Sequence, residues 1–414
     1  MGLDETDVKP LPSLFLVCVI DVLGFGILIP LIPYMAAQFG ASPSLNTWIL
    51  ATYSACQLLA APLWGRLSDR FGRRPILLTS MLGACTSYVI LGFAHSLPTL
   101  FLARALAGVM AGNLSAAMAY ASDISQPADR AKTMGTVGAA IGIGFMLGPV
   151  IGGALAGEQL QSASFVRPAL VSACLSLLAM LLVLFMLPES QTAEQRRTHA
   201  AEGGPRLHAL QLLRKLPGLR WLALGTLLTT FSQSTLESIF AIWAMNRYHI
   251  GPRSVGMALF ALAIVAVGVQ GGLVGRLARR FGEYRLTFAA IACYGLGLTT
   301  VAASHELPLV IVGLMCCGLG AGLFNPSGSA LASRESQPSN RGAVMGTYQI
   351  GTSMARVLAP LVSGPVYMRF GPSAPFLLAA LVTLQAGWCM LAVRRVHAAA
   401  NRSGELSERR QGLR

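Results

Sequence analysis

Four ionisable side chains stand inside long apolar stretches of the sequence, where a charge is costly to bury. Asp21 and Glu237 are carboxylic acids, and Arg104 and Arg356 are cations. A carboxylate in such surroundings can take up and release a proton. Arg356 could bind an anionic substrate or neutralise Glu237. A structural interpretation, as an interhelical hydrogen bond or a counter-ion, stays open for each charge, and the sequence leaves open whether Asp21 pairs with Arg104.

The apolar stretches that hold these charges are long enough to cross a bilayer. The chain has 414 residues, of which 54% are hydrophobic and 12% charged, whereas soluble domains carry about 25% charge. This composition excludes a disordered, collagenous or ordinary cytosolic protein. Twelve stretches of spanning length predict an all-α membrane protein with twelve transmembrane helices. They are 13–36, 46–64, 76–94, 97–120, 132–156, 167–187, 221–245, 254–275, 286–303, 308–332, 342–367 and 374–393.

The basic residues predict how these helices are oriented. With both termini in the cytoplasm, 25 of the 31 lysines and arginines fall on the inner side and four on the outer side. This asymmetry is the positive-inside pattern of a multi-pass protein in a bacterial-type cell inner (plasma) membrane. The net charge of +14 is therefore explained by topology, and we expect a lipid bilayer and no nucleic acid as partner. The acidic first ten residues and the long first stretch favour a retained helix over a cleaved signal peptide.

The two halves of the chain repeat each other. SQPADRAKTMG at 125–135 recurs as SQPSNRGAVMG at 336–346, and GRLSDRFG at 65–72 recurs as GRLARRFG at 275–282. The offsets of 211 and 210 residues agree, so we predict two pseudo-symmetric six-helix bundles with a substrate cavity between them. The predicted domains are an N-terminal bundle (1–188), a cytoplasmic linker (189–219), a C-terminal bundle (220–395) and a basic cytoplasmic tail (396–414).

The most specific motif is GRLSDRFGRRP at 65–75, the loop motif, between the second and third stretches. Asp69 and Arg73 stand four residues apart and can pair on a helix. The motif resembles the signature of the major facilitator superfamily, in which the acidic residue helps to latch the outward-facing state. The resemblance implies a latch in the first half only, because Arg279 replaces Asp69 in the second copy. The implied latch residues are Gly65, Asp69, Arg70, Gly72, Arg73, Asp123 and Arg130.

A second motif, GIGFMLGPVIGG at 142–153, is the Gly-rich segment. It lacks the strand and loop of a phosphate cradle, so close helix packing is the simpler interpretation. It resembles the antiporter signature of twelve-span drug/proton exporters, carried by Gly144, Gly148, Pro149, Gly152 and Gly153. Together with IDVLGFGILIPLIP at 20–33, the chain looks similar to the tetracycline/proton antiporter branch. The resemblance implies proton coupling at Arg104, beside the acids Asp21 and Glu237 that we expect to carry protons.

Polar and aromatic side chains within the spans are candidates for lining the cavity. A mostly apolar pocket with a few amides suits amphipathic ligands. The candidates are Gln57, Asn113, Phe145, Gln233, Phe240, Gln270, Asn325, Gln349 and Arg356.

No sequence pattern points to an enzyme. The chain has no Walker motif, no HExxH and no GxSxG, its eight cysteines form no CxxC, and its six histidines fall in loops or at helix ends. We therefore expect no metal and no cofactor, only a proton gradient. The predicted function is proton-coupled efflux of amphipathic small molecules, such as a drug or antibiotic, by alternating access of a monomer. The alternatives are export of an endogenous metabolite such as a siderophore, uptake by proton symport, and a passive facilitator or channel.

Overall fold

The computed structural model describes residues 10–126, 129–158, 164–192, 208–334 and 341–411. These residues form helices and connecting turns, without a β-strand among them. The chain divides into two compact units, one of Met1–Gly204 with Phe240–Ala263 and one of Pro205–Ile239 with Ile264–Arg414. The helices α11 (Pro217–Tyr248) and α12 (Pro252–Gly268) each contribute residues to both units.

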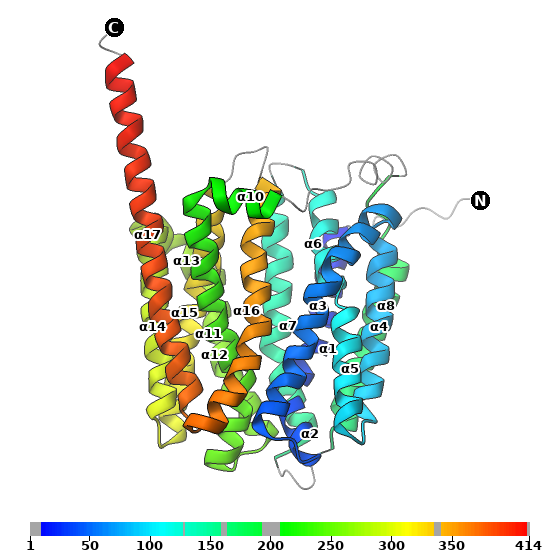
Figure 1. Ribbon diagram of the computed structural model, residues 1–414. Helices are drawn as coiled ribbons and strands as arrows, with labels where there is room; N and C mark the ends of the chain where they lie inside the picture. Colours follow the sequence, from blue (N-terminus) through cyan, green and yellow to red (C-terminus); the bar gives the residue numbers. More distant parts are fainter. Residues whose placement is uncertain (1–9, 127–128, 159–163, 193–207, 335–340, 412–414) are drawn as a thin grey trace, which may run out of the picture. The chain divides into compact units, whose positions relative to one another are not determined.

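In the first unit, α1 packs against α7 and α8, α4 against α5 and α8, and α3 against α5 (Figure 1). Its core brings together α1, α4, α6, α7 and α8 around Leu14, Leu77, Tyr120 and Val137, all fully buried. The helices are α1 (Pro10–Leu28), α2 (Ile32–Gln38), α3 (Pro43–Phe71), α4 (Arg73–Gly92), α5 (Leu97–Val109), α6 (Asn113–Asp123), α7 (Arg130–Ala156) and α8 (Val166–Met186).

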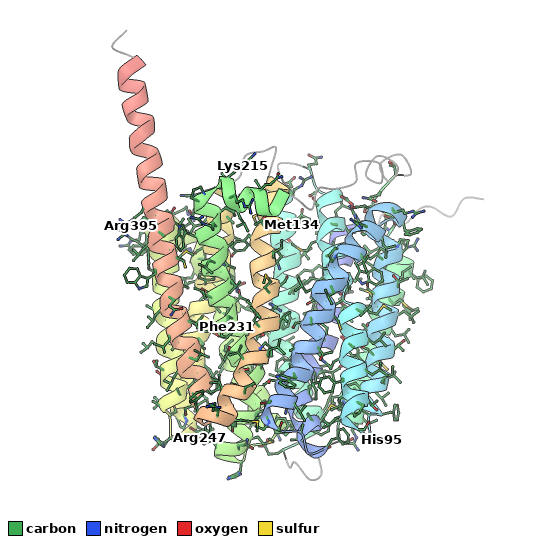
Figure 2. All side chains as sticks on the ribbon, in the orientation of Figure 1. His95, Met134, Lys215, Phe231, Arg247 and Arg395 are labelled. Atoms are coloured by element: carbon green, nitrogen blue, oxygen red, sulfur yellow. The ribbon has the colours of Figure 1, made fainter. Side chains whose placement is uncertain are left out.

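In the second unit, α14 packs against α15 and α17, and α16 contacts α10, α15 and α17. The last helix projects beyond its neighbours in this unit (Figure 1), and Figure 2 labels Lys215 and Arg395 toward that end, with Phe231 midway along α11. The helices and the π-helical turn η1 are α10 (His208–Lys215), η1 (Val269–Leu273), α13 (Val274–Phe281), α14 (Glu283–Ala303), α15 (Leu307–Arg334), α16 (Arg341–Phe370) and α17 (Ala374–Gln411).

Each of the twelve predicted stretches is occupied by a helix or by consecutive helical segments, and the all-α membrane fold is confirmed. Three stretches are interrupted, which the hydrophobic pattern did not predict. The first breaks at 29–31 beside Pro30, the fourth at 110–112, and the eighth passes through η1. Interruptions at membrane depth occur where the freed backbone groups are buried in protein or line a cavity.

The surface confirms that these helices meet lipid. Leu59, Phe185 and Trp388 are 76%, 80% and 73% exposed, which would be a liability in water but suits a bilayer. Nine helices of the described chain are apolar enough over 18 residues to qualify as spans on composition alone. Helices α3, α11 and α16 have 29, 32 and 30 residues but lie outside that group. Among other polar residues, they carry Gln57, Glu237 and Arg356, so the least apolar helices hold many of the candidate site residues.

Candidate functional site

Asp21 lies on α1, inside the first unit, and is only 8% exposed. Its carboxylate accepts a hydrogen bond from Asn113 Nδ2, at the first residue of α6. Arg104 does not pair with it, because the ion pairs of the described chain lie elsewhere. A neutral amide therefore meets this carboxylate, so a proton can come and go without breaking an ion pair.

The break at 110–112 is what brings Asn113 to Asp21. At the break, the carbonyl oxygen of Val109 accepts a hydrogen bond from the Trp64 indole. Gly112 packs on the same indole, where an added Cβ would lie 2.6 Å from Trp64 Cγ. The interruption is thus stabilised by α3, and it turns the fourth span into two helices.

Arg104, on α5, is 4% exposed and lies among aromatic rings. Its guanidinium carbon is 4.4 Å from the centre of the Tyr53 ring and 5.9 Å from that of Phe25. Phe25 also makes an edge contact with Phe145, with ring centres 6.0 Å apart. Two predicted residues, Arg104 and Phe145, therefore belong to one cluster built from α1, α3, α5 and α7.

Glu237 and Arg356 are brought near each other inside the second unit. Helices α11 and α16 touch at the hydroxyls of Ser238 and Ser363, which are 3.2 Å apart. Arg356 interacts electrostatically with Glu237, although the two are not among the ion pairs closer than 4.0 Å. Both side chains are exposed. Glu237 lies roughly 140° around α11 from the exposed Leu224, at 100° per residue, so it does not share the face that Leu224 presents.

The remaining cavity candidates are dispersed. Gln57 and Gln233 are half-buried, and Gln270, Asn325 and Gln349 are exposed. Phe240 is 1% exposed and packs against Trp243, with ring centres 6.0 Å apart, so its ring is part of the packing rather than an open lining.

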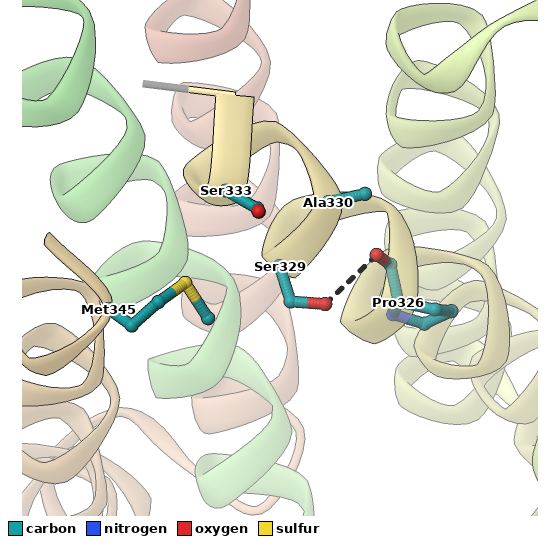
Figure 3. A pocket seen from close by; sticks show the side chains of 5 residues that line it. All are labelled: Pro326, Ser329, Ala330, Ser333 and Met345. Atoms are coloured by element: carbon teal, nitrogen blue, oxygen red, sulfur yellow. Dashed lines mark hydrogen bonds between the residues drawn. The ribbon is translucent and has the colours of Figure 1, made fainter. Parts of the chain in front are cut away.

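A cavity of about 430 Å³ lies between α15 and α16 in the second unit (Figure 3). Its wall includes the hydroxyls of Ser329 and Ser333. The Ser329 hydroxyl donates a hydrogen bond to the carbonyl of Pro326 at 3.0 Å. None of the predicted cavity residues lines it. The lining residues are Pro326, Ser329, Ala330, Ser333 and Met345.

The loop motif folds around Arg73, which is 8% exposed. Its guanidinium contacts Asp69 at 2.7 Å and Asp123 at 3.1 Å, and it also donates to Ser68 at 2.9 Å. Asp69, Arg73 and Asp123, three of the residues predicted to form a latch, are thus together.

The other residues of the predicted latch play different parts. Arg70 lies over the Phe71 ring, and among the described residues neither Arg70 nor Arg130 joins an ion pair. Gly65 faces open space, and Gly72 has a φ of +104° at the turn between α3 and α4.

Glu189 belongs to this cluster, and the sequence interpretation missed it. Its carboxylate accepts hydrogen bonds from the backbone N–H of Arg73 at 2.9 Å and of Arg74 at 3.1 Å, at the start of α4. A Cβ on Gly72 would collide with this carboxylate. The available signal was a lone acid just after an apolar span, opposite a helix N-terminus that attracts negative charge.

The second repeat has an ion pair of its own with the charges exchanged. Glu283 and Arg334 contact each other at 2.8 Å. With the repeat offsets of 210 and 211, these positions correspond to Arg73 and Asp123. The Arg73–Asp123 ion pair therefore has a counterpart of opposite polarity in the second repeat, whereas Asp69 has none because Arg279 stands in its place. The latch in the first half stays a prediction.

The Gly-rich segment brings α7 into backbone contact with α1. A Cβ on Gly148 would lie 2.5 Å from the Gly26 carbonyl carbon, and one on Gly144 would lie 2.8 Å from Val22 Cβ. A Cβ on Gly152 would collide with Ile27. These contacts fit the predicted close packing and leave no room for a nucleotide between the two helices.

The far end of α7 holds residues of the second repeat, within the first unit. Glu158 accepts hydrogen bonds from Gly251 N–H at 2.9 Å, Ser254 N–H at 3.1 Å and Ser254 Oγ at 2.7 Å. Tyr34 donates to the carbonyl of Ile250 at 3.0 Å. We call residues 250–256, with these contacts, the clamped turn. It lies at the end of α7 opposite Arg130, where Figure 2 labels His95 and Arg247.

The clamped turn also packs on the Gly-rich segment. A Cβ on Gly153 would lie 2.6 Å from the carbonyl oxygen of Pro252, and a Cβ on Gly256 would collide with Pro149. The start of α12 therefore depends on Glu158 and on the small residues of α7.

A repeated set of membrane-spanning helices, with buried charges and interrupted spans, defines a multi-pass transporter rather than an enzyme. The family model of the Major Facilitator Superfamily matches residues 14–298 and 222–412. The chain belongs to this superfamily.

Relatives and solved structures agree with this assignment. The chain is 27% identical over 372 residues to the class H tetracycline resistance protein of Pasteurella multocida, covering 87% of this chain and 89% of that protein. It is 29% identical over 364 residues to the class C protein of Escherichia coli, covering 84% and 87%. The human organic anion transporter MFSD10 superposes with a TM-score of 0.70 at 24% identity, over 92% of this chain and 98% of that one.

Proposed function

We propose that this transporter exports amphipathic small molecules, tetracycline-like drugs among them, in exchange for protons. Its place is a bacterial-type inner membrane, with both termini in the cytoplasm, and it works as a monomer with no cofactor besides the proton gradient. The observation that carries the proposal is Asp21, a buried carboxylate held by the neutral Asn113 at a helix break. The tetracycline resistance relatives supply the cargo class.

The mechanism follows from the cost of a buried charge. A proton that enters from the outer side neutralises Asp21 and removes the penalty of enclosing a charge in apolar surroundings. The protonated and ionised forms therefore favour different conformations, which is the requirement for coupling. Asp69 with Arg73 and Asp123, and the clamped turn at the other end, are the contacts that would form and break in that cycle.

The test is a transport assay on full-length protein in proteoliposomes. A panel of tetracycline, an aromatic cation and an aromatic carboxylate is assayed with and without an imposed pH gradient. The proposal expects gradient-dependent movement of at least one compound, abolished by a protonophore. Movement that ignores the gradient would instead indicate the passive facilitator.

Export of an endogenous anionic metabolite is a second candidate, favoured by one observation. Arg356 is exposed and is not closely paired with Glu237, so it can receive an anion. The aromatic carboxylate in the panel separates this candidate from export of cations.

A further inference from the structure

Arg104 is a buried cation without a counter-ion in the described part of the chain. It is 4% exposed, its Nε has no hydrogen-bond acceptor, and it takes part in none of the ion pairs. Leaving a buried guanidinium uncompensated is expensive. A transporter can retain such a charge where its cargo supplies the opposite one.

The nearest groups around the Arg104 guanidinium are aromatic rings, which supply no opposite charge. Tyr53 and Phe25 lie at cation–π distances, 4.4 and 5.9 Å from the guanidinium carbon. Such rings stack on the flat face of a guanidinium, whereas its N–H donors point outward in its plane. Rings can therefore hold the side chain in place without satisfying its hydrogen bonds.

The carboxylate most expected to neutralise Arg104 is engaged elsewhere. Asp21 accepts from Asn113, and Tyr88 lies within electrostatic range of both charges. Phe25, Tyr53 and Phe145 are only half-buried, so part of this aromatic surface is accessible. Arg104 thus adjoins aromatic side chains that a cargo can reach.

We propose that Arg104 binds the anionic group of the cargo, a carboxylate, enolate or sulfonate carried on an aromatic body. The guanidinium pairs with two oxygens of the anion, as its fork geometry favours. The body of the cargo stacks on Phe25, Tyr53 and Phe145. This assignment rests on the proposed function and names the cargo class for the same site.

The first test is equilibrium binding without any gradient. Full-length protein in nanodiscs is titrated with 1-naphthoate and with the neutral 1-naphthamide, which has the same ring. The wild type should bind the anion at least about tenfold tighter, and Arg104→Gln should reduce this preference to about twofold or less. Arg167→Gln, at an exposed arginine of α8 outside the candidate site, is the matched control and should keep the preference. An unchanged preference in Arg104→Gln, or a loss of the preference in Arg356→Gln instead, would overturn the proposal.

The second test separates a binding role from a structural one. A buried charge without a counter-ion is costly in the unliganded protein, and the ring contacts of Arg104 offset only part of that cost. Arg104→Gln should therefore unfold at the same temperature as wild type or higher. A clear fall in the unliganded Tm would mean that Arg104 is a structural counter-ion. Phe145→Leu should weaken naphthoate and naphthamide alike, because Phe145 offers stacking surface beside Phe25 and is not one of the rings over Arg104. An effect confined to naphthoate would contradict this arrangement.

These outcomes are independent of the transport assay. If the preference for naphthoate depends on Arg104 but no gradient-driven efflux is seen, the proposed function is refuted and the anion site at Arg104 is retained. If efflux is seen without that preference, the anion site is refuted and the proposed function is retained.

Discussion

At the scale of residues, the charges of this chain differ in how they are compensated. Arg73 has two carboxylates and a serine hydroxyl around it. Asp21 has a single neutral amide, and Arg104 has aromatic rings alone. Arg73, whose charge is compensated by two carboxylates, suits a structural role. Asp21 and Arg104 suit exchange with a proton and a ligand, respectively.

A substitution of Asp69 tests whether the ion pairs around Arg73 act on the conformational change of transport rather than on cargo binding. Asp69→Asn removes one charge from the Arg73 cluster and leaves the contact between Arg73 and Asp123. We expect the transport rate to fall by about tenfold or more, with cargo affinity changed by less than about twofold. The measurement is initial transport rate alongside equilibrium binding. A large loss of affinity would mean that Asp69 touches the cargo.

The sequence indicated these residues but not their partners. Asp21 and Arg104 were identifiable because a charge in an apolar stretch is conspicuous. Asn113 was proposed only as a cavity residue, since its contact with Asp21 spans 92 positions and depends on the break at 110–112. Such a break is set by packing on Trp64, which no local pattern encodes.

At the scale of elements, α7 carries two kinds of contact along its length. Its glycines meet the backbone of α1, and its far end meets the clamped turn. Small residues matter in such interfaces because backbones approach closely in lipid without a hydrophobic driving force.

Gly148→Ala should therefore destabilise the protein where a matched glycine does not. Its Cβ would meet Gly26 at 2.5 Å, and overpacking of this kind costs about 1–3 kcal/mol. Gly138, on the same helix, has open space, so Gly138→Ala should be neutral or stabilise by up to about 1 kcal/mol. Thermal unfolding in detergent compares the two. Equal stabilities would argue against close α1–α7 contact.

Glu158 should control the opening of the clamped turn. Glu158→Gln removes the charge that accepts from Gly251 and Ser254, and amide hydrogen exchange over 250–256 should accelerate by about tenfold, which equals about 1.4 kcal/mol. Glu306 is an exposed acid without a side-chain hydrogen bond or ion pair among the described residues, and Glu306→Gln is the control. Equally slow exchange in both variants would show that Glu158 does not stabilise the clamped turn.

At the scale of the whole molecule, duplication explains the architecture and also its asymmetry. Twelve hydrophobic stretches and two agreeing repeat offsets were enough to predict the fold class, since both follow from the bilayer and from the repeat. The domain limits stay a prediction, and part of the linker at 189–219 and the end of the tail lie outside the described residues. Glu283 and Arg334 lie just outside the recurring segments at 275–282 and 336–346, so the repeat did not predict their ion pair.

The two corresponding ion pairs should differ in energy. The Arg73 side chain is 9% exposed, whereas that of Arg334 is 63% exposed. Arg73→Gln should cost about 1.5–3 kcal/mol for each hydrogen bond it loses to a charged partner, and Arg334→Gln less than about 1 kcal/mol. Unfolding of the two single variants measures this difference, and a larger loss for Arg334→Gln would contradict the burial argument.

Asp21 is the residue proposed to carry the exchanged proton. The direct measurement is the internal pH of proteoliposomes after addition of tetracycline, or of whichever compound in the panel is exported, for wild type and Asp21→Asn. We predict proton movement in the wild type and none in the variant, with cargo binding retained. Equal proton movement in both proteins would exclude Asp21 as the proton carrier.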